Sequence, residues 1–216
     1  MANRLALPPL YVILDAALLS SDATEFLKKL MDAGARLFQY RNKTASAREL
    51  LHAAQALTLT ARQENAILIV NDRPDIARLT GSNGVHVGQQ DVGADAARAI
   101  VGPVATVGIS THNLEQFQAA EGSEADYIAI GPVFETRSKA HPDPLVGLDL
   151  VRQARRLTSK PIVAIGGITL ERAASVIEAG ADSVAVISDI LAAKNPVARV
   201  KHYLEVLPAA VESAGN

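Results

Sequence analysis

The sequence contains no cysteine and no long hydrophobic run, and these absences exclude several classes of protein. Without cysteine there is no disulfide scaffold, no thiolate zinc site and no cysteine nucleophile. The longest uncharged stretch near the N-terminus, residues 5–14, is followed by Asp15 and is shorter than the ~20 apolar residues of a membrane span. Because Pro8 and Pro9 also interrupt this stretch, we expect neither a signal peptide nor a membrane partner. The lack of cysteine fits the reducing cytoplasm, where we expect the protein to work.

The chain also has little net charge and few aromatic residues. Its 21 lysines and arginines nearly balance 23 acidic residues, which argues against general nucleic-acid binding but allows a local cationic pocket for an anionic substrate. The four tyrosines and four phenylalanines form no obvious interface patch, so a homo-oligomer remains open. With 216 residues the chain can bury a large core, and we expect one domain over residues 1–216, with 213–216 as a frayed tail.

Short apolar segments alternate with segments of helical periodicity along the whole chain. Many of the apolar segments are nearly continuous in valine, isoleucine and alanine, which is typical of parallel strands buried on both faces. Such alternation predicts a parallel sheet, and eight units can close into a TIM barrel; an open doubly wound sheet is the alternative. The expected strands are residues 10–14, 37–40, 67–71, 84–87, 106–110, 127–131, 162–165 and 183–187.

Two kinds of local signal mark the expected helix ends. Ser46 and Glu49 have the spacing of a capping box, which predicts the start of a helix. Gly34 and Gly180 each follow a helical segment and precede a strand, in the similar phrases DAGARL and EAGADS. The sequence has no G-x-G-x-x-G after the first strand, which weakens a dinucleotide-binding interpretation.

A TIM barrel places its active site at the C-terminal ends of the strands, where this sequence has many polar residues. Gln39, Arg41 and Lys43 follow the second strand at alternate positions, so they point to one side if the strand continues. An arginine fork and a lysine ammonium together predict a site for a diphosphate. A solvated strand edge would explain the same spacing.

Asp72 and Asp91 follow the third and fourth strands and are candidate metal ligands. Proteins usually hold Mg²⁺ with one or two carboxylates, water and substrate phosphates, so this pair predicts a Mg²⁺–diphosphate site. As an alternative, each aspartate caps the helix that follows it.

The later strands are followed by residues suited to a second phosphate. Gly166, Gly167 and Ser188 lie where barrels often bind phosphate, although a tight turn would also explain the glycines. Residues 135–147 carry Lys139 among hydroxyl side chains and predict a lid, with an ordinary surface loop as the alternative. Among the histidines, His86 is expected to pack inside the barrel, and His112 is assigned no role.

Seven motifs in a fixed order identify a resemblance to the thiamine phosphate synthase family. The resemblance covers roughly residues 10–191 and implies a TIM barrel. The motifs are QYRNK (39–43), NDR (71–73), GVHVGQQD (84–91), GISTH (108–112), AIGPVFETRSK (129–139), VAIGGI (163–168) and GADSVAVIS (180–188).

The resemblance implies a transferase of thiamine biosynthesis. The family joins 4-amino-2-methyl-5-pyrimidinylmethyl diphosphate to a methylthiazole-ethyl phosphate, or to its carboxylated form, by a dissociative Mg²⁺-assisted substitution that yields thiamine phosphate and pyrophosphate. The implied residues for the pyrimidine diphosphate are Gln39, Tyr40, Arg41, Asn42, Lys43, Asn71, Ser110 and Lys139, of which Arg41, Lys43, Ser110 and Lys139 are catalytic. Those for the thiazole phosphate are Thr136, Arg137, Ser138, Gly167, Ile187 and Ser188, and those for Mg²⁺ are Asp72 and Asp91.

One departure from the family pattern is visible, and two other functions compete. The family often has T-x-T-K where this chain has Thr136, Arg137, Ser138 and Lys139, and serine retains the hydroxyl.

The related thiazole tautomerases share the barrel but lack the full diphosphate and Mg²⁺ residues, which this chain retains. A phosphate-binding barrel without catalysis is the other alternative.

Overall fold

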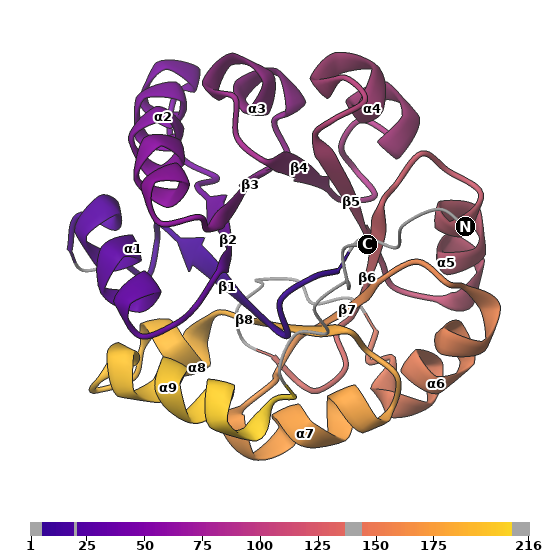
Figure 1. Ribbon diagram of the computed structural model, residues 1–216. Helices are drawn as coiled ribbons and strands as arrows, with labels where there is room; N and C mark the ends of the chain where they lie inside the picture. Colours follow the sequence, from indigo (N-terminus) through magenta and orange to yellow (C-terminus); the bar gives the residue numbers. More distant parts are fainter. Residues whose placement is uncertain (1–5, 20, 137–143, 209–216) are drawn as a thin grey trace, which may run out of the picture.

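The computed structural model describes residues 6–19, 21–136 and 144–208, and these form a closed eight-stranded parallel barrel. Each strand pairs with the next along the chain, and β8 pairs with β1 to close the sheet. Figure 1 looks into the barrel and shows the helices as an outer ring. The TIM-barrel prediction is confirmed, and the open-sheet alternative is wrong.

The strand boundaries agree with the sequence expectation to within one residue. Five expected strand ends shift by one residue, because hydrogen-bond pairing between neighbouring strands, and not hydrophobicity, decides where a strand stops. For example, β1 extends past its expected end at residue 14, since Asp15 still pairs with Arg41 in the β1–β2 ladder. The strands are β1 (Leu10–Asp15), β2 (Leu37–Arg41), β3 (Ile67–Asn71), β4 (Gly84–Val87), β5 (Thr106–Thr111), β6 (Tyr127–Ile130), β7 (Ile162–Ile165) and β8 (Ser183–Val186).

Two helix boundaries show the local chemistry that the sequence predicts. The capping box of α2 is present, with Ser46 N–H donating to Glu49 at 2.8 Å and Glu49 N–H donating to Ser46 at 3.3 Å. Gly34 follows α1 at φ +106°, a conformation that favours glycine. The helices are α1 (Ala23–Asp32), α2 (Ala47–Gln63), α3 (Pro74–Thr80), α4 (Ala94–Val101), α5 (Leu114–Glu121), α6 (Gly147–Leu157), α7 (Leu170–Glu178), α8 (Ser188–Leu191) and α9 (Pro196–Val206).

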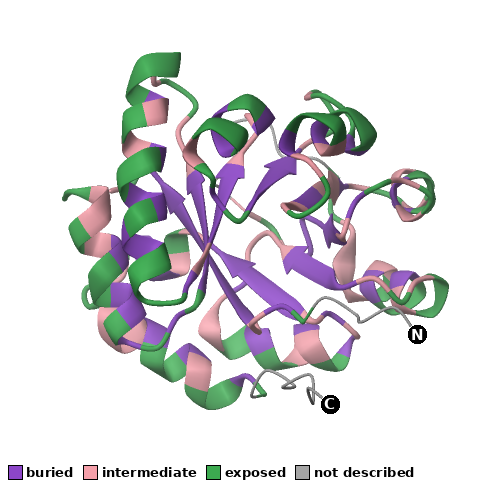
Figure 2. Cartoon of the chain, turned by 45° about the horizontal axis from the view of Figure 1, so that its top comes forward, coloured by how far each residue is buried: buried purple, intermediate pink, exposed green. Residues whose placement is uncertain are grey.

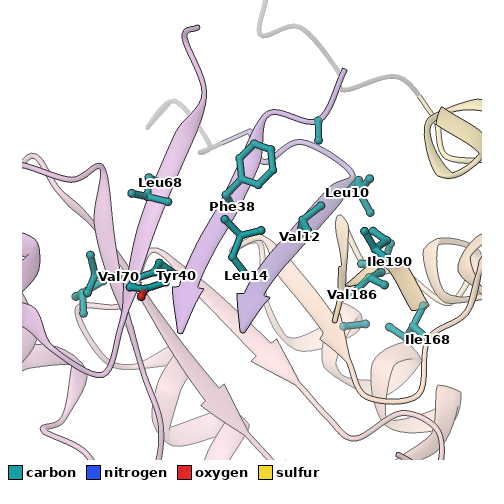
Figure 3. Close-up of a cluster of buried hydrophobic side chains, with 14 of the residues drawn as sticks. Leu10, Val12, Leu14, Phe38, Tyr40, Leu68, Val70, Ile168, Val186 and Ile190 are labelled. Atoms are coloured by element: carbon teal, nitrogen blue, oxygen red, sulfur yellow. The ribbon is translucent and has the colours of Figure 1, made fainter. Parts of the chain in front are cut away.

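The strands separate two apolar layers. Alternate residues of β1 such as Val12 and Leu14 pack outward against the helices, and Figure 3 shows them in this outer layer together with Phe38 and Val70. The intervening residues, including Tyr11, fill the barrel interior. Figure 2 shows the strands buried and the outer helix surfaces exposed, as expected for a sheet covered by helices.

The helices of the described residues are packing elements of this barrel. None of them combines the length and the apolar character that crossing a membrane requires. The expected frayed tail at 213–216 lies outside the described residues, and the single-domain assignment for 1–216 stays a prediction.

Candidate active site

A cavity of about 1060 Å³ opens at the C-terminal ends of the strands and collects most of the predicted site. Of the predicted residues, Arg137, Ser138 and Lys139 lie outside the described part of the chain. The predicted residues that line the cavity are Gln39, Arg41, Lys43, Asn71, Asp72, Asp91, Ser110, Thr136, Gly167, Ile187 and Ser188.

Two predicted residues, Tyr40 and Asn42, have side chains that do not line this cavity. The alternation of β2 turns Tyr40 outward into the helix-facing layer, beside Val70 in Figure 3. Asn42 donates to the Tyr40 hydroxyl at 3.3 Å, and its Oδ1 accepts the N–H of Ala45 at 3.0 Å. These two side chains therefore stabilise the loop that carries Lys43.

Three cationic side chains line the cavity. Arg41 and Lys43 each contact a carboxylate in or next to a neighbouring strand, whereas Arg172 of α7, which the sequence analysis missed, donates to the Gly167 carbonyl at 2.9 Å. The Arg41 guanidinium forms an ion pair with Asp15, and the Lys43 ammonium forms one with Asp72. Asp15 is only 5% exposed and was missed at the sequence level. The available signal was its position, since it is the one charged residue of the apolar segment LYVILD.

The two predicted metal ligands do not cap helices, so the capping alternative is wrong. The helices α3 and α4 have Arg73 and Gly93 as N-cap residues, and neither start has a side-chain cap. Asp91 instead accepts the Gly88 N–H at 2.8 Å. Asp72 lies at φ +61°, and its N–H donates to the His86 carbonyl at 2.7 Å.

The electrostatics of the Asp72–Asp91 pair suit a divalent cation. Burial raises the pKa of Asp91, and the adjacent Asp72 carboxylate raises it further, while the Gly88 N–H and Lys43 oppose the rise. A cation between the two carboxylates would relieve this repulsion. Within the described residues there is no group of three or more acidic or histidine side chains for a metal, so two carboxylates plus substrate phosphate is the arrangement that fits Mg²⁺ here.

Polar side chains also continue into the barrel interior below the carboxylates. His86 is 7% exposed and contacts Tyr127 and Ser110, which confirms that it packs inside the barrel. Burial lowers the pKa of His86 to about 4, so the ring is neutral at pH 7. Burial raises the pKa of Tyr11 and of Tyr127. The two tyrosines line the interior but were missed, because an aromatic residue in an apolar strand usually indicates core.

On the other side of the cavity, the β7–α7 loop packs closely against the loop after β6. Gly167 has φ +61°, and a Cβ there would lie 2.2 Å from the Glu135 carbonyl oxygen. Gly166 has φ +100° and would clash with Pro132. Both glycines therefore form the tight turn, and the same turn lines the cavity.

Ser188 reaches the cavity at the start of α8, and its neighbour Asp189 connects three helices. Asp189 accepts the Tyr203 hydroxyl of α9 at 2.7 Å and the Leu170 N–H of α7 at 3.2 Å. These bonds fix the β7–α7 and β8–α8 loops relative to each other. His112 also lines the cavity, and its Nδ1 contacts the Gly131 carbonyl at 2.6 Å.

Comparisons with known proteins agree with this geometry. The family model described as thiamine monophosphate synthase matches residues 10–190. A thiamine-phosphate synthase of Koribacter versatilis is 51% identical over 96% of this chain and 99% of its own length. One from Chlorobium phaeovibrioides is 44% identical over 85% of this chain and 86% of its own.

A solved structure supports the same assignment. The thiamine phosphate pyrophosphorylase from Pyrococcus furiosus superposes with a TM-score of 0.83 at 31% identity, covering 94% of this chain and 96% of the other. Sequence, family model and barrel geometry thus converge, and the chain belongs to the thiamine monophosphate synthase family and is an enzyme of the transferase class.

Proposed function

We propose that this protein joins 4-amino-2-methyl-5-pyrimidinylmethyl diphosphate to a methylthiazole-ethyl phosphate to give thiamine phosphate and pyrophosphate, or to the carboxylated form of that phosphate with the additional release of CO₂. The observation that supports the proposal is one cavity with two regions of different chemistry, each of which suits an anion. One region, from β2 to β4, combines cations with a carboxylate pair. The other, from β7 and β8, offers a glycine turn and Ser188, on the opposite side of the closed barrel (Figure 1).

The cationic region suits the pyrimidine diphosphate. Arg41 and Lys43 line the cavity beside Asp72 and Asp91, so phosphate oxygens entering there meet both cations and the metal ligands. Asp72 and Asp91 would hold Mg²⁺, which supplies positive charge to the pyrophosphate as it leaves. Lys139, which the family resemblance assigns to the same substrate, would add a further cation. Gln39, Asn71 and Ser110 offer hydrogen bonds deeper in the cavity.

The second region suits the thiazole phosphate. Main-chain N–H groups of a tight turn and a helix start can bind phosphate oxygens without a formal charge. Gly167, Ile187 and Ser188 come together in this region, and Thr136 lies on the adjoining loop. Arg137 and Ser138 are assigned here by the family resemblance.

The chemistry requires no nucleophilic side chain. The bond between the pyrimidinylmethyl carbon and the diphosphate oxygen breaks, and its electron pair leaves with pyrophosphate. The thiazole nitrogen then donates its lone pair to the resonance-stabilised cation and forms the new C–N bond. Arg41 and Lys43 stabilise the charge that grows on the leaving group, and the cavity holds the two rings together.

In the free cavity, Asp15 pairs with Arg41 and Asp72 pairs with Lys43. When a diphosphate enters with Mg²⁺, Asp72 would exchange Lys43 for the metal, which it would hold together with Asp91, and the freed ammonium would contact the phosphate beside Arg41. This exchange makes diphosphate binding depend on the metal. It also separates the proposed function from simple phosphate binding.

The decisive experiment incubates the purified protein with both substrates and Mg²⁺ and measures thiamine phosphate and pyrophosphate by chromatography. We expect both products in equal amounts, and none when either substrate or the metal is omitted. Conversion of the thiazole phosphate between its tautomers without coupling would instead establish a tautomerase. Binding of the substrates without any turnover would establish a non-catalytic phosphate-binding barrel.

A further inference from the structure

Five polar side chains form one unbroken hydrogen-bonded chain across the floor of the cavity. Gln39 contacts Tyr11 at 2.9 Å, Tyr11 contacts Tyr127 at 3.1 Å, and Tyr127 contacts His86 at 2.9 Å. His86 then contacts Ser110 at 2.8 Å. The two ends, Gln39 and Ser110, are both assigned to the pyrimidine substrate, whereas the three residues between them have no assigned role.

The chain is built into the packing of the interior. The rings of His86 and Tyr127 stack with centroids 5.5 Å apart, and Tyr11 meets Tyr127 edge-on at 6.2 Å. Gly108 of β5 makes room for them, since a Cβ there would lie 2.0 Å from the Tyr127 ring. Tyr11 and Tyr127 are each 1% exposed, which favours hydrogen bonds between their hydroxyls and protein partners over bonds to water.

Every hydroxyl proton of the chain finds an acceptor when the protons run in one direction, away from Gln39. The amide of Gln39 donates to Tyr11, so the single Tyr11 proton is directed to Tyr127. The Tyr127 proton is in turn directed to Nδ1 of His86, which must then be an acceptor. A neutral imidazole that accepts at Nδ1 carries its proton on Nε2.

The direction of the last bond decides what Ser110 can offer a ligand. In the Nε2-protonated tautomer, His86 donates to the Ser110 oxygen, and among the described residues that hydroxyl contacts no other side chain. Its own proton is therefore directed toward the cavity, where Ser110 acts as a donor. With the other imidazole tautomer Ser110 would donate to His86, and it would meet a ligand only as an acceptor.

We propose that His86 and Tyr127 are positioning residues that hold Ser110 as a hydrogen-bond donor to an acceptor atom of the pyrimidine diphosphate. The assignment of that ligand rests on the proposed function, but the direction of the chain does not. If the Ser110 proton pointed to His86, the Ser110 oxygen would face the acceptor atom of the ligand with no proton between them. Two unpaired acceptors in a buried site would weaken binding.

The free protein provides the first test, without any substrate or variant. Long-range ¹H–¹⁵N spectra of protein labelled in histidine report which imidazole nitrogen carries the proton, and a His86→Gln sample assigns the His86 signals. We expect His86 to be protonated on Nε2 only, at pH 7. A proton on Nδ1, or on both nitrogens, overturns the proposal whatever the protein catalyses.

A double-mutant cycle provides the second test and separates positioning from folding. Calorimetric titration with the pyrimidine diphosphate and Mg²⁺, without the second substrate, gives the dissociation constant of each variant. We expect Tyr127→Phe to weaken binding about fivefold, the value of one ordinary hydrogen bond. In a Ser110→Ala background the same change should matter less than twofold, because its effect passes through Ser110.

Two controls give each result a meaning. Equal losses in both backgrounds would show that Tyr127 acts only on the general shape of the barrel, and the proposal would fail. Thermal unfolding of all four proteins checks that they are folded at the titration temperature. If the wild-type protein does not bind the pyrimidine diphosphate, the proposed function fails while the histidine spectra still decide the direction of the chain.

Discussion

Arg41 lies opposite Asp15 in the β1–β2 ladder, and its guanidinium forms an ion pair with that carboxylate at the edge of the cavity. Asp15 also accepts the Ala17 N–H at 3.1 Å, so the carboxylate is held from a second direction. The pair therefore fixes the guanidinium before a substrate arrives. Electrostatic groups that are already oriented need no reorganisation when charge develops on a leaving group.

The first prediction is that Asp15→Asn lowers kcat ~10-fold and changes KM for the pyrimidine diphosphate less. Asparagine keeps the oxygen that accepts the Ala17 N–H but loses the charge that orients Arg41, so the transition state suffers more than the ground state. Steady-state kinetics with Asp126→Asn as the control check this. Asp126 also pairs with an arginine, Arg98, but lies immediately before β6, at the other end of the strands. A similar fall in kcat for both variants would contradict the prediction.

The second prediction concerns the carboxylate pair. We expect Asp91→Asn to raise the Mg²⁺ concentration for half-maximal activity ~10-fold or more, because second-shell contacts alone are worth 10–100-fold in metal affinity and a ligand is worth at least as much. Asp95→Asn is the matched control, since the Asp95 carboxylate also accepts a main-chain N–H, that of Glu124, but does not line the cavity. Unchanged Mg²⁺ dependence of the Asp91 variant would remove Asp91 from the metal site.

The third prediction separates backbone strain from contact at the glycine turn. Gly147 and Gly167 have φ values of +67° and +61°, but a Cβ at Gly147 meets no described atom within 4 Å. We expect Gly147→Ala to lower the free energy of unfolding by ~1 kcal/mol, the cost of the left-handed conformation. Gly167→Ala should lose a further ~1–3 kcal/mol through overpacking.

The same pair of variants also tests the thiazole phosphate site. Only Gly167→Ala should raise KM for the thiazole phosphate, because only this glycine lines the cavity. Urea unfolding and steady-state kinetics give the two readouts. Equal unfolding energies and equal KM values for the two variants would show that the close approach to Glu135 has no consequence.

The fourth prediction follows from the buried imidazole. His86 has a pKa lowered from 6.5 to about 4 by burial, so between these values the unfolded chain binds a proton that the native state does not. The free energy of unfolding therefore contains a contribution from neutral His86 that is fully present above pH 6.5 and is lost as the pH falls toward 4. This contribution amounts to ~3 kcal/mol at most. Urea unfolding between pH 7 and 5 without divalent metal should show a shallower pH dependence for His86→Gln. Identical slopes for the two proteins would contradict a buried neutral His86.

The fold was predictable because its signals are local. Runs of valine and isoleucine, the capping box at Ser46 and the glycines after helices all act over a few residues, so they could be found without knowing what packs against them. Most of the candidate site followed from the fold, since a TIM barrel brings all strand C-terminal ends to one face.

The remainder of the site depends on partners distant in the chain. Tyr11 and Tyr127 are 116 residues apart, and periodicity shows only that each points inward, not that their hydroxyls meet. For Tyr40 and Asn42 the sequence predicted too much. The motif at 39–43 assigns every one of its residues to the substrate, although the alternation of β2 turns the Tyr40 side chain away from the cavity and Asn42 bonds to Tyr40. Asp15 fell one residue beyond the expected end of β1, where its role depends on Arg41 of the next strand.

The hydrogen bond between Tyr203 and Asp189 has a consequence for the order in which the molecule is assembled. Asp189 joins the start of α7 to the start of α8, and Tyr203 belongs to α9, which follows all eight strands. β8 precedes α9 in the chain, so the loops around Ser188 gain this buried contact only when α9 has packed against them. A chain shortened to end before Tyr203 would therefore lack the hydrogen bond that helps to fix the β7–α7 and β8–α8 loops at this side of the cavity.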